Sequence, residues 1–317
     1  MIHNPQMECM DRESMRKLQS ERLVKTVKTC YEKVPFYKKK MDRMGVKPED
    51  IRSIDDIHKL PFTTKHDLRD EYPFGLQAVP QSEVRRIHAS SGTTGKPVVD
   101  TYTENDLKMW AEGVARVMAV GDIGPGDIVQ VSYGYGLFTG GLGAHDGAAL
   151  RGAVQLPTSA GNSEKQIMLM KDFGSTALCC TPSYALHLAE VIEKSPDVNV
   201  EDLKLRVGFF GAEPWTWGIR RELEKKLHIK ASTRTAPTLP RTCSTPKSST
   251  PRRSNLWLRA NRANSSSPPS ARRPCPSSAI APATSPISST SLASAAAPQC
   301  ASARFWVAAT TCSSSAA

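Results

Sequence analysis

The last 86 residues of this 317-residue chain, after Ala231, contain no aspartate, glutamate, glycine, tyrosine or histidine. All 31 acidic residues and all 20 glycines lie before Ser232, where 32 basic residues minus 31 acidic ones leave a formal charge of +1. Nine arginines and one lysine in the remainder carry the rest of the net charge of +11. The composition therefore excludes one uniformly folded chain, and it excludes a basic folded surface as the source of the charge.

Long apolar runs are also absent. No segment reaches the roughly 18 consecutive apolar residues of a membrane-spanning helix, and charged side chains interrupt residues 1–20, unlike a signal peptide. The eight cysteines show no Cys-x-x-Cys spacing and no cluster with histidine, which argues against a disulfide framework and a structural zinc site. We expect a soluble, cytoplasmic protein without a protein-bound metal, in which Cys179 and Cys180 are reduced thiols in a buried strand.

The hydrophobic pattern predicts an α/β fold. Helices are expected over residues 11–33 and on to about Met44, and Thr64 is expected to cap a helix over Lys65–Glu71. From residue 84, short apolar runs alternate with amphipathic stretches, which predicts a parallel-rich sheet flanked by helices. The expected strands are Val84–His88, Ile128–Ser132, Val154–Leu156, Thr176–Cys180 and Leu205–Phe210. The expected helices are Asn105–Val120, Leu142–Arg151, Glu164–Phe173, Ser183–Glu193 and Trp217–Leu227.

Three regions follow from this pattern and from the composition. Residues 1–83 are an N-terminal helical region, and residues 84–231 are an α/β core. Residues 232–317 are a tail rich in Ser, Ala, Pro and Arg. Ligands of parallel sheets bind at the carboxyl ends of the strands, and three clusters of glycine follow expected strands.

The first cluster runs from His88 to Pro97 as His-Ala-Ser-Ser-Gly-Thr-Thr-Gly-Lys-Pro. Glycine backbone, hydroxyl groups and a lysine together favour the binding of phosphate oxygens. The cluster is not a Walker A loop, because Ser90 and Pro97 stand where that pattern needs Gly and Ser or Thr. A polar turn between two strands is the alternative interpretation.

The second cluster runs from Tyr133 to Gly143 and holds five glycines among aromatic residues. Glycine beside aromatic side chains predicts a flat apolar pocket wall that a ligand approaches closely. The alternative is that Tyr133 and Phe138 are ordinary core residues.

The third cluster, Phe209 to Trp215, again lies at a strand end. Its small residues admit a flat ring, and Glu213 could accept a hydrogen bond from an amino group or a ribose. The alternative for Glu213 is an acid at a helix N-terminus, favoured by the helix dipole. His88 and His145 are candidate polar contacts or structural histidines. No Gly-x-Ser-x-Gly and no His-Glu-x-x-His motif supports a hydrolase or a zinc protease.

These three clusters, in this order, resemble the adenylate-forming acyl-CoA synthetases and, among them, the phenylacetate-CoA ligases. The resemblance covers about residues 3–231 and includes Pro61–Lys65, Gln166–Met170 and Cys179–Tyr184. It implies an acid-thiol ligase that joins an aryl acid to CoA through an acyl adenylate, with ATP and CoA as co-substrates and Mg²⁺ to offset phosphate charge. It is compatible with a homodimer.

The resemblance also implies site residues. It assigns the triphosphate to Ser90, Ser91, Gly92, Thr93, Thr94, Gly95 and Lys96. It assigns the adenine site to Gly211, Ala212, Glu213 and Pro214, and the aryl pocket to Tyr133, Tyr135, Gly136 and Phe138. It assigns no catalytic residue, because the family's Thr-Glu pair and catalytic lysine do not occur in this sequence.

The family pattern stops after Ala231, and a shift of reading frame accounts for the tail. Residues 232–317 contain 20 Ser, 17 Ala, 11 Pro and 10 Thr, which is 58 of 86. When codons that end in TC, GC, AC or CC are read one base late, those two bases become the first two of the new codon. The new codons then encode Ser, Ala, Thr and Pro, respectively. The earlier frame permits VLTTLGKEALPIIRYRTRD over residues 266–284 and VLGRSDDMLIIRG over residues 305–317, and both resemble family segments. We therefore expect a truncated, frameshifted ligase with little activity as written, without its C-terminal lid domain.

Two alternatives stay open. The enzyme could act on another aryl acid, such as benzoate. A protein of another class would be a binding module whose disordered basic tail holds nucleic acid through its arginines. The ligase hypothesis expects small-molecule partners only, with neither nucleic acid nor membrane.

Overall fold

The computed structural model describes residues 1–90 and 95–232. The predicted tail and the alternative of a nucleic-acid-binding arm lie outside these residues, as do Ser91, Gly92, Thr93 and Thr94. The division into regions 1–83, 84–231 and 232–317 stays a prediction. None of the described helices is both long enough and apolar enough to cross a membrane.

The N-terminal region is helical, as predicted. Its α-helices are α1 Pro5–Glu8, α2 Arg12–Lys33, α3 Pro35–Arg43 and α4 Lys65–Asp70, and its 3-10 helices are η1 Pro48–Asp50, η2 Ile54–Lys59 and η3 Gln81–Glu83. Helix α2 ends because the residue before Pro35 takes extended backbone angles. Thr64 caps α4 by accepting a hydrogen bond from the Asp67 N–H, which confirms the predicted cap.

The next two strands form a separate antiparallel hairpin, β1 Val84–Ala89 and β2 Val99–Thr103. The expected strand Val84–His88 therefore exists but does not belong to the parallel sheet, and the first glycine cluster connects the strands of a hairpin. Helix α5, Glu104–Val120, follows directly, with Thr103 and Asp106 forming its capping box.

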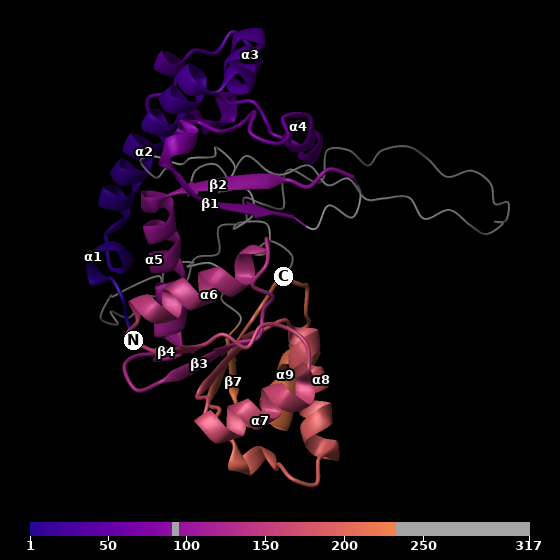
Figure 1. The fold of residues 1–317 in the computed structure, drawn as a ribbon. Helices are drawn as coiled ribbons and strands as arrows, with labels where there is room; N and C mark the ends of the chain where they lie inside the picture. The colour runs from indigo at the N-terminus through magenta and orange to yellow at the C-terminus, as the bar shows by residue number, and fades with distance from the viewer. Residues whose placement is uncertain (91–94, 233–317) are drawn as a thin grey trace, which may run out of the picture. The chain divides into compact units, whose positions relative to one another are not determined.

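The parallel sheet has five strands in the order β4-β3-β5-β6-β7, of which β3, β4 and β7 are labelled in Figure 1. The strands are β3 Ile128–Val131, β4 Val154–Leu156, β5 Ala177–Cys180, β6 Val207–Phe210 and β7 Lys230–Ser232, and every neighbouring pair is parallel. The connections are helical: α6 Thr139–Leu150, α7 Ser163–Phe173, α8 Pro182–Lys194, η4 Val200–Asp202 and α9 Trp217–Leu227. The predicted fold class is confirmed for this part of the chain.

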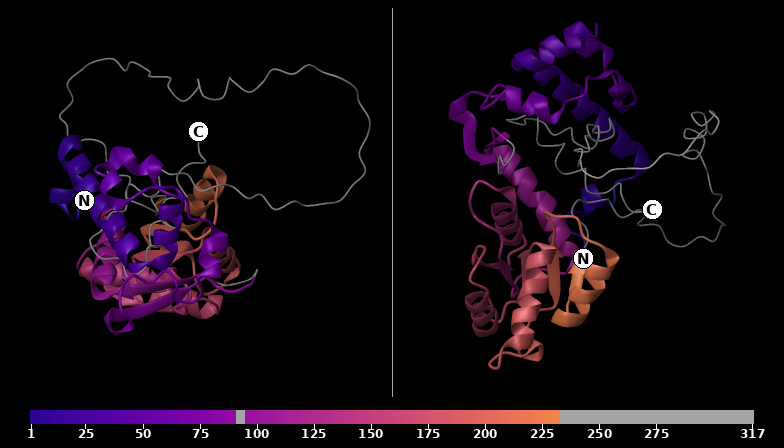
Figure 2. Two further views of the ribbon diagram at one scale, coloured as in Figure 1. Left: turned by 90° about the horizontal axis from the view of Figure 1, so that it is seen from above. Right: turned by 90° about the vertical axis from the view of Figure 1, so that its right-hand side faces the viewer.

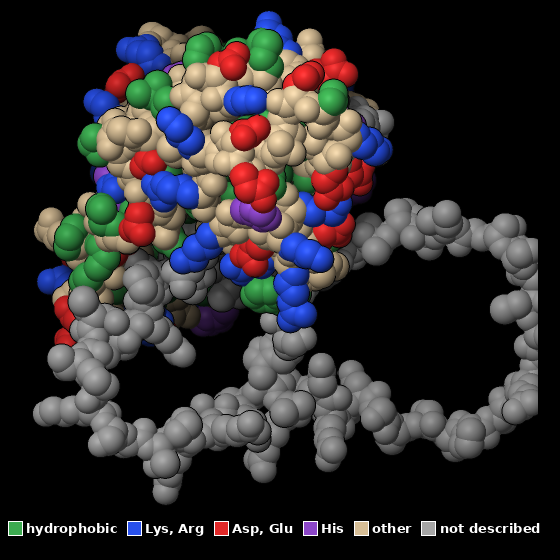
Figure 3. Space-filling view, turned by 90° about the horizontal axis from the view of Figure 1, so that it is seen from below, with side chains coloured by type: hydrophobic (Ala, Val, Ile, Leu, Met, Phe, Trp, Pro, Cys, Tyr) green, Lys and Arg blue, Asp and Glu red, His purple; other side chains and the backbone are tan. Residues whose placement is uncertain are grey.

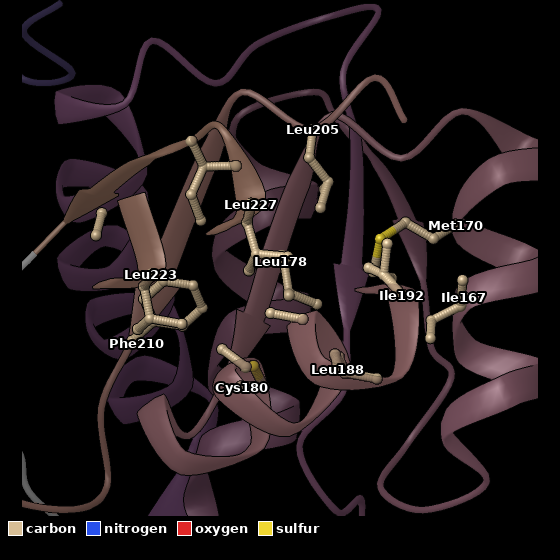
Figure 4. Close-up of a cluster of buried hydrophobic side chains, with 14 of the residues drawn as sticks. Ile167, Met170, Leu178, Cys180, Leu188, Ile192, Leu205, Phe210, Leu223 and Leu227 are labelled. Carbon is tan, nitrogen blue, oxygen red and sulfur yellow. The ribbon is translucent and has the colours of Figure 1, made fainter. Parts of the chain in front are cut away.

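Helices cover both faces of this sheet. Leu178 and Cys180 face a core with α7, α8 and α9, to which Leu188 and Leu223 contribute (Figure 4). The alternate residues of the same strand, such as Cys179, face a second core with α5 and α6. Helix α9 packs beside α8 (Figure 2). Both cysteines are free and buried, as predicted, and burial raises the pKa of Cys179 to about 12.

The surface of the described part agrees with its small net charge. On the face shown in Figure 3, Lys and Arg side chains alternate with Asp and Glu side chains instead of forming one basic patch. The charge of the first 231 residues, and not the +11 of the whole chain, therefore describes the folded surface.

Candidate functional site

The strand order places a crevice between β3 and β5. The chain leaves β3 to form β4 on one side and then crosses to form β5 on the other side of β3. The connections that follow β3 and β5 therefore lead to opposite sides of the sheet. In open α/β sheets, ligands bind at such a point, beyond the carboxyl ends of the two strands. The sheet therefore predicts a site beside residues 132–134 and 181–184.

A pocket of about 560 Å³ lies there. Its volume falls within the range of roughly 300–1,000 Å³ that is typical of small-molecule sites. It is lined by Ser132, Tyr133, Gly134 and Phe138 after β3, by Ala160 and Gly161 before α7, by Thr181, Ser183, Tyr184 and His187 after β5, and by Ala212 after β6. The wall combines aromatic rings with hydroxyl groups and one imidazole.

Tyr133 joins the two sides of the crevice. Its hydroxyl donates a hydrogen bond of 2.6 Å to the Cys180 carbonyl oxygen, which also accepts from the Gly211 N–H at 3.4 Å. Burial raises the pKa of the Tyr133 hydroxyl well above its usual range, so the group remains a neutral donor. The ring packs against the core of α5 and α6 and also lines the pocket.

Phe138 lies at the pocket rim, and the interpretation of Phe138 as a core residue is wrong. Helix α6 begins at Thr139, earlier than the expected Leu142, which makes Phe138 its N-cap residue. The side chain is 48% exposed. It is therefore free to contact a ligand, as the pocket-wall interpretation requires.

The glycines of the second cluster serve two purposes. A Cβ atom on Gly141 would lie 2.8 Å from the Gly134 carbonyl oxygen, and one on Gly143 would lie 2.6 Å from the Trp110 ring. These two glycines are required by packing within the protein. A Cβ atom on Gly134 or Gly136 would meet nothing within 4 Å. Only Gly134 of that pair lines the pocket.

Tyr135 and Gly136, also expected in the aryl site, do not line this pocket. Tyr135 makes a 3.4 Å contact with Nδ1 of His145, so that the candidate His145 is engaged within the protein. Burial raises the pKa of Tyr135 to about 12.

The third cluster brings Ala212 to the pocket in a left-handed backbone conformation, with φ of 72°. Gly211 is buried, and Pro214 is exposed. An oxygen of Glu213 accepts a 2.5 Å hydrogen bond from the Ser183 N–H in the first turn of α8. Glu213 thus does stabilise a helix N-terminus, but that of α8 and not of the following helix α9.

The described residues of the first cluster close the β1-β2 hairpin. Ser90 and Val98 exchange two hydrogen bonds of 2.9 Å, one through the backbone and one from the Val98 N–H to the Ser90 hydroxyl. Gly95 takes a φ of 130°, and the Lys96 ammonium lies 5.4 Å from the centre of the Tyr72 ring. None of these residues lines the pocket, and their phosphate contacts stay a prediction.

His88 links this hairpin to the second cluster. The Ala89 N–H donates to the Leu137 carbonyl oxygen at 3.0 Å, and Nδ1 of His88 lies 2.9 Å from the same oxygen. Nδ1 must carry the proton, because a carbonyl only accepts. Burial lowers the pKa of His88, which favours this neutral form.

Sequence reasoning missed the part of the pocket wall that comes from α8. Thr181 is the N-cap of α8, accepting from the Tyr184 N–H, and the Tyr184 and His187 rings lie 6.1 Å apart one helical turn on. Two features of the sequence could have indicated this wall. Thr181-Pro182-Ser183 directly follows a buried strand, and Tyr184 and His187 are three positions apart, which places them on one face of a helix. These residues include no glycine, the residue type that marks the other parts of the pocket wall at the strand ends.

The described residues show no metal centre. Across residues 1–90 and 95–232, no group of three or more His, Cys, Asp or Glu side chains could hold a metal ion. Mg²⁺ that is held by one or two carboxylates together with substrate phosphates does not require such a group.

Comparison with known proteins finds ligases that are similar to this chain. No family model matches the chain. Curated phenylacetate-coenzyme A ligases do match: those of Thermus thermophilus and Pseudomonas putida are each 50% identical, over 232 and 225 residues, and that of Escherichia coli K12 is 49% identical over 234 residues. Over the matched residues the chain is similar to these phenylacetate-coenzyme A ligases. The matched part represents 71–73% of this chain but only 51–54% of these relatives, so the chain spans about half the length of the curated relatives it matches.

Solved structures of another CoA ligase share the fold of the matched part. The open conformation of 2-hydroxyisobutyryl-CoA ligase in complex with 2-HIB-AMP and CoA matches with a TM-score of 0.67 and 30% identity, over 72% of this chain and 54% of that one. The same ligase in its thioesterification state matches with a TM-score of 0.68 and 31% identity, over 72% and 50%. The predicted resemblance to adenylate-forming CoA ligases is confirmed.

Proposed function

We propose that residues 1–232 are the acid- and nucleotide-binding part of an ATP-dependent phenylacetate-CoA ligase. The observation that supports this most is the aromatic pocket at the carboxyl ends of β3 and β5, in a chain about 50% identical to phenylacetate-CoA ligases. The aryl ring of the acid lies against Tyr133, Phe138 and Tyr184. The carboxylate faces the polar groups of the wall, Thr181, Ser183 and His187.

The reaction has two steps. A carboxylate oxygen of phenylacetate attacks the α-phosphorus of ATP, and the bond to pyrophosphate breaks. The thiolate of CoA then attacks the carbonyl carbon of the acyl adenylate, and AMP leaves with the bonding electron pair. In the first step the residues described above bind and orient the acid, and they exclude water from the adenylate.

ATP, CoA and Mg²⁺ complete the proposal. Solved relatives were crystallised with an acyl adenylate and CoA. Mg²⁺ would offset phosphate charge on ATP. A cytoplasmic location, a homodimer and the absence of nucleic acid partners are further parts of the same proposal. Benzoate is the competing substrate, and the pocket volume alone does not discriminate between the two acids.

The chain as written is proposed to be inactive, because its tail is an out-of-frame translation. The support is that the matched lengths of 219–234 residues are close to the 231 residues that precede the change of composition. The test is to sequence the gene around codon 231 and to assay phenylacetyl-CoA formation by both forms. The restored frame should turn over phenylacetate on the order of 1 per second or more, whereas the present chain should not.

The outcomes separate the parts of the proposal. Comparable turnover by the chain as written would contradict the frameshift but support the ligase. A restored chain that forms benzoyl-CoA but no phenylacetyl-CoA would support the sibling enzyme. A reading frame interrupted by stop codons would favour the basic-arm alternative, which predicts salt-sensitive nucleic acid binding lost on deletion of residues 232–317.

A further inference from the structure

Gln166 on α7 has every hydrogen-bonding group of its side chain occupied inside the protein. It is 2% exposed. Its Nε2 group donates to the carbonyl oxygens of Ser159 at 2.6 Å and Gly161 at 3.3 Å. Its Oε1 atom accepts from Nε2 of Gln130 and from the Ser132 hydroxyl, both at 2.8 Å. A buried amide satisfied in this way is held in one orientation.

Backbone carbonyl groups fix that orientation, because they only accept: those of Ser159 and Gly161 require the amino group of Gln166 to face the loop. The backbone carbonyl oxygen of Gln166 likewise accepts from Nε2 of Gln130 at 3.2 Å, so that the amino group of Gln130 faces Gln166. Rotating the Gln166 amide would bring two amino groups together. Gln166 must therefore donate toward the loop that precedes α7.

This loop has an unusual backbone. Ser159, Gly161 and Asn162 have φ values of 62°, 91° and 48°, so that three of four consecutive residues are left-handed. For residues other than glycine this conformation is strained and persists only when the surroundings enforce it. The two hydrogen bonds from Gln166 enforce it here, on either side of Ala160.

The same loop is a wall of the pocket. Ala160 and Gly161 line it, and so does Ser132, which donates to Gln166 from the opposite side. The Gly161 carbonyl oxygen also accepts from the Tyr184 hydroxyl at 3.3 Å. One buried amide thus connects three pieces of the wall that come from different strands.

We propose that Gln166 is a positioning residue, whose amide holds the loop 159–162 in its left-handed conformation and thereby sets the shape of the acid pocket. The statement that the pocket takes an aryl acid rests on the function proposed above. The conformational role of Gln166 stands independently of the ligand.

The test compares two variants of the full chain, Gln166→Met and Gln130→Met. Methionine has a similar volume and makes no strong hydrogen bond. Both variants remove an amide from the same buried network, but Gln130 makes no bond to the loop. Hydrogen exchange of residues 158–163 and binding of phenylacetate are measured for each, with thermal unfolding to record any general loss of stability.

Q166M should speed exchange in residues 158–163 by about tenfold and weaken phenylacetate binding by a similar factor, because the loop loses two hydrogen bonds. Q130M should lower the unfolding temperature comparably and change both readouts less than about threefold. Equal effects of the two variants, or unchanged loop exchange in Q166M, overturn the proposal. If phenylacetate binds to no form of the chain, the function fails, and loop exchange alone supports or overturns the role of Gln166.

Discussion

The hydroxyl of Tyr133 donates a 2.6 Å hydrogen bond to the carbonyl oxygen of Cys180 and so joins the ends of β3 and β5 across the crevice of the sheet. The two strands are also paired through their backbones, up to the Ser132 N–H, which donates to the Cys179 carbonyl oxygen at 2.8 Å, so the Tyr133 bond continues this pairing beyond the strand ends. The bond also turns the Tyr133 ring toward the pocket, which relates the stability of the sheet to the shape of the site.

Removing this hydroxyl tests its contribution. Tyr133→Phe should lower the free energy of unfolding by about 1 kcal/mol, because the Cys180 carbonyl loses its shorter partner while the ring remains. Urea denaturation measures the change. Tyr135→Phe is the matched control, since its hydroxyl contact with His145 is 3.4 Å long, and it should cost less. Equal costs for the two variants would contradict the assignment.

Glu213 should stabilise α8 from outside that helix. Glu213→Ala removes the acceptor of the Ser183 N–H and should cost about 1 kcal/mol, as the loss of an N-cap does. Glu213→Gln keeps an oxygen acceptor and should cost less than half as much. Thermal unfolding of both variants decides the point, and a Gln variant as unstable as the Ala variant would count against capping.

His88 should stabilise the fold through the hydrogen bond that its Nδ1 donates to the Leu137 carbonyl oxygen, and not through Nε2. Asparagine places its amino group near the position of Nδ1, whereas glutamine places it near Nε2, an atom that has no hydrogen-bond partner among the described residues. His88→Asn should therefore retain more stability than His88→Gln or His88→Ala, by about 1 kcal/mol. The ranking is read from denaturation midpoints. Glutamine equal to or better than asparagine would show that the Leu137 contact is unimportant.

The ion pair between Asp127 and Arg206 should give the fold an acid-sensitive contribution. Burial of Asp127 raises its pKa, but hydrogen bonds from Arg206, Thr176 and the Gly124 N–H outweigh it, and the net pKa is lowered. A carboxyl with a lowered folded-state pKa stabilises the protein above its unfolded pKa of about 3.9, and this stability is lost as the pH falls through the folded value.

Asp127→Asn tests that contribution directly. The variant should be less stable than the parent at pH 7, and the difference should shrink as the pH falls below about 4, because the parent carboxyl is then protonated. Urea unfolding at a series of pH values measures it. A difference that stays constant down to pH 2 would mean that the charge of Asp127 contributes nothing.

Local pattern predicted most of the elements, because caps and periodicity act within a few residues. Thr64 and the residue before Pro35 set helix ends as expected. The pairing of β1 was beyond such reasoning: its partner β2, Val99–Thr103, has no apolar run, and the pairing depends on residues on the far side of a loop. Strand β7 has only three residues and no apolar signal of its own.

The sequence indicated only the parts of the pocket wall that have a local pattern, and it did not indicate the long-range contacts between them. Glycine and aromatic residues indicated Tyr133, Phe138 and Ala212 at strand ends, and these line the pocket. The contacts that hold the pocket are long-range: Glu213 bonds Ser183 across 30 positions, and Gln166 bonds Ser132 across 34. Gln166 lies within a segment that resembles the family, yet a single glutamine in a helix gives no sign of what its amide reaches.

The central claim is that this pocket holds the aryl acid, and the two neighbouring glycines of the second cluster test it directly. Gly134 lines the pocket and Gly136 does not, while a Cβ atom at either would meet nothing within 4 Å. Phenylacetate binding is measured by titration calorimetry on Gly134→Leu and Gly136→Leu. The account predicts a loss of about tenfold or more in affinity for G134L and less than about threefold for G136L, at unchanged unfolding temperature. Undiminished binding by G134L, or equal losses in both variants, would contradict it.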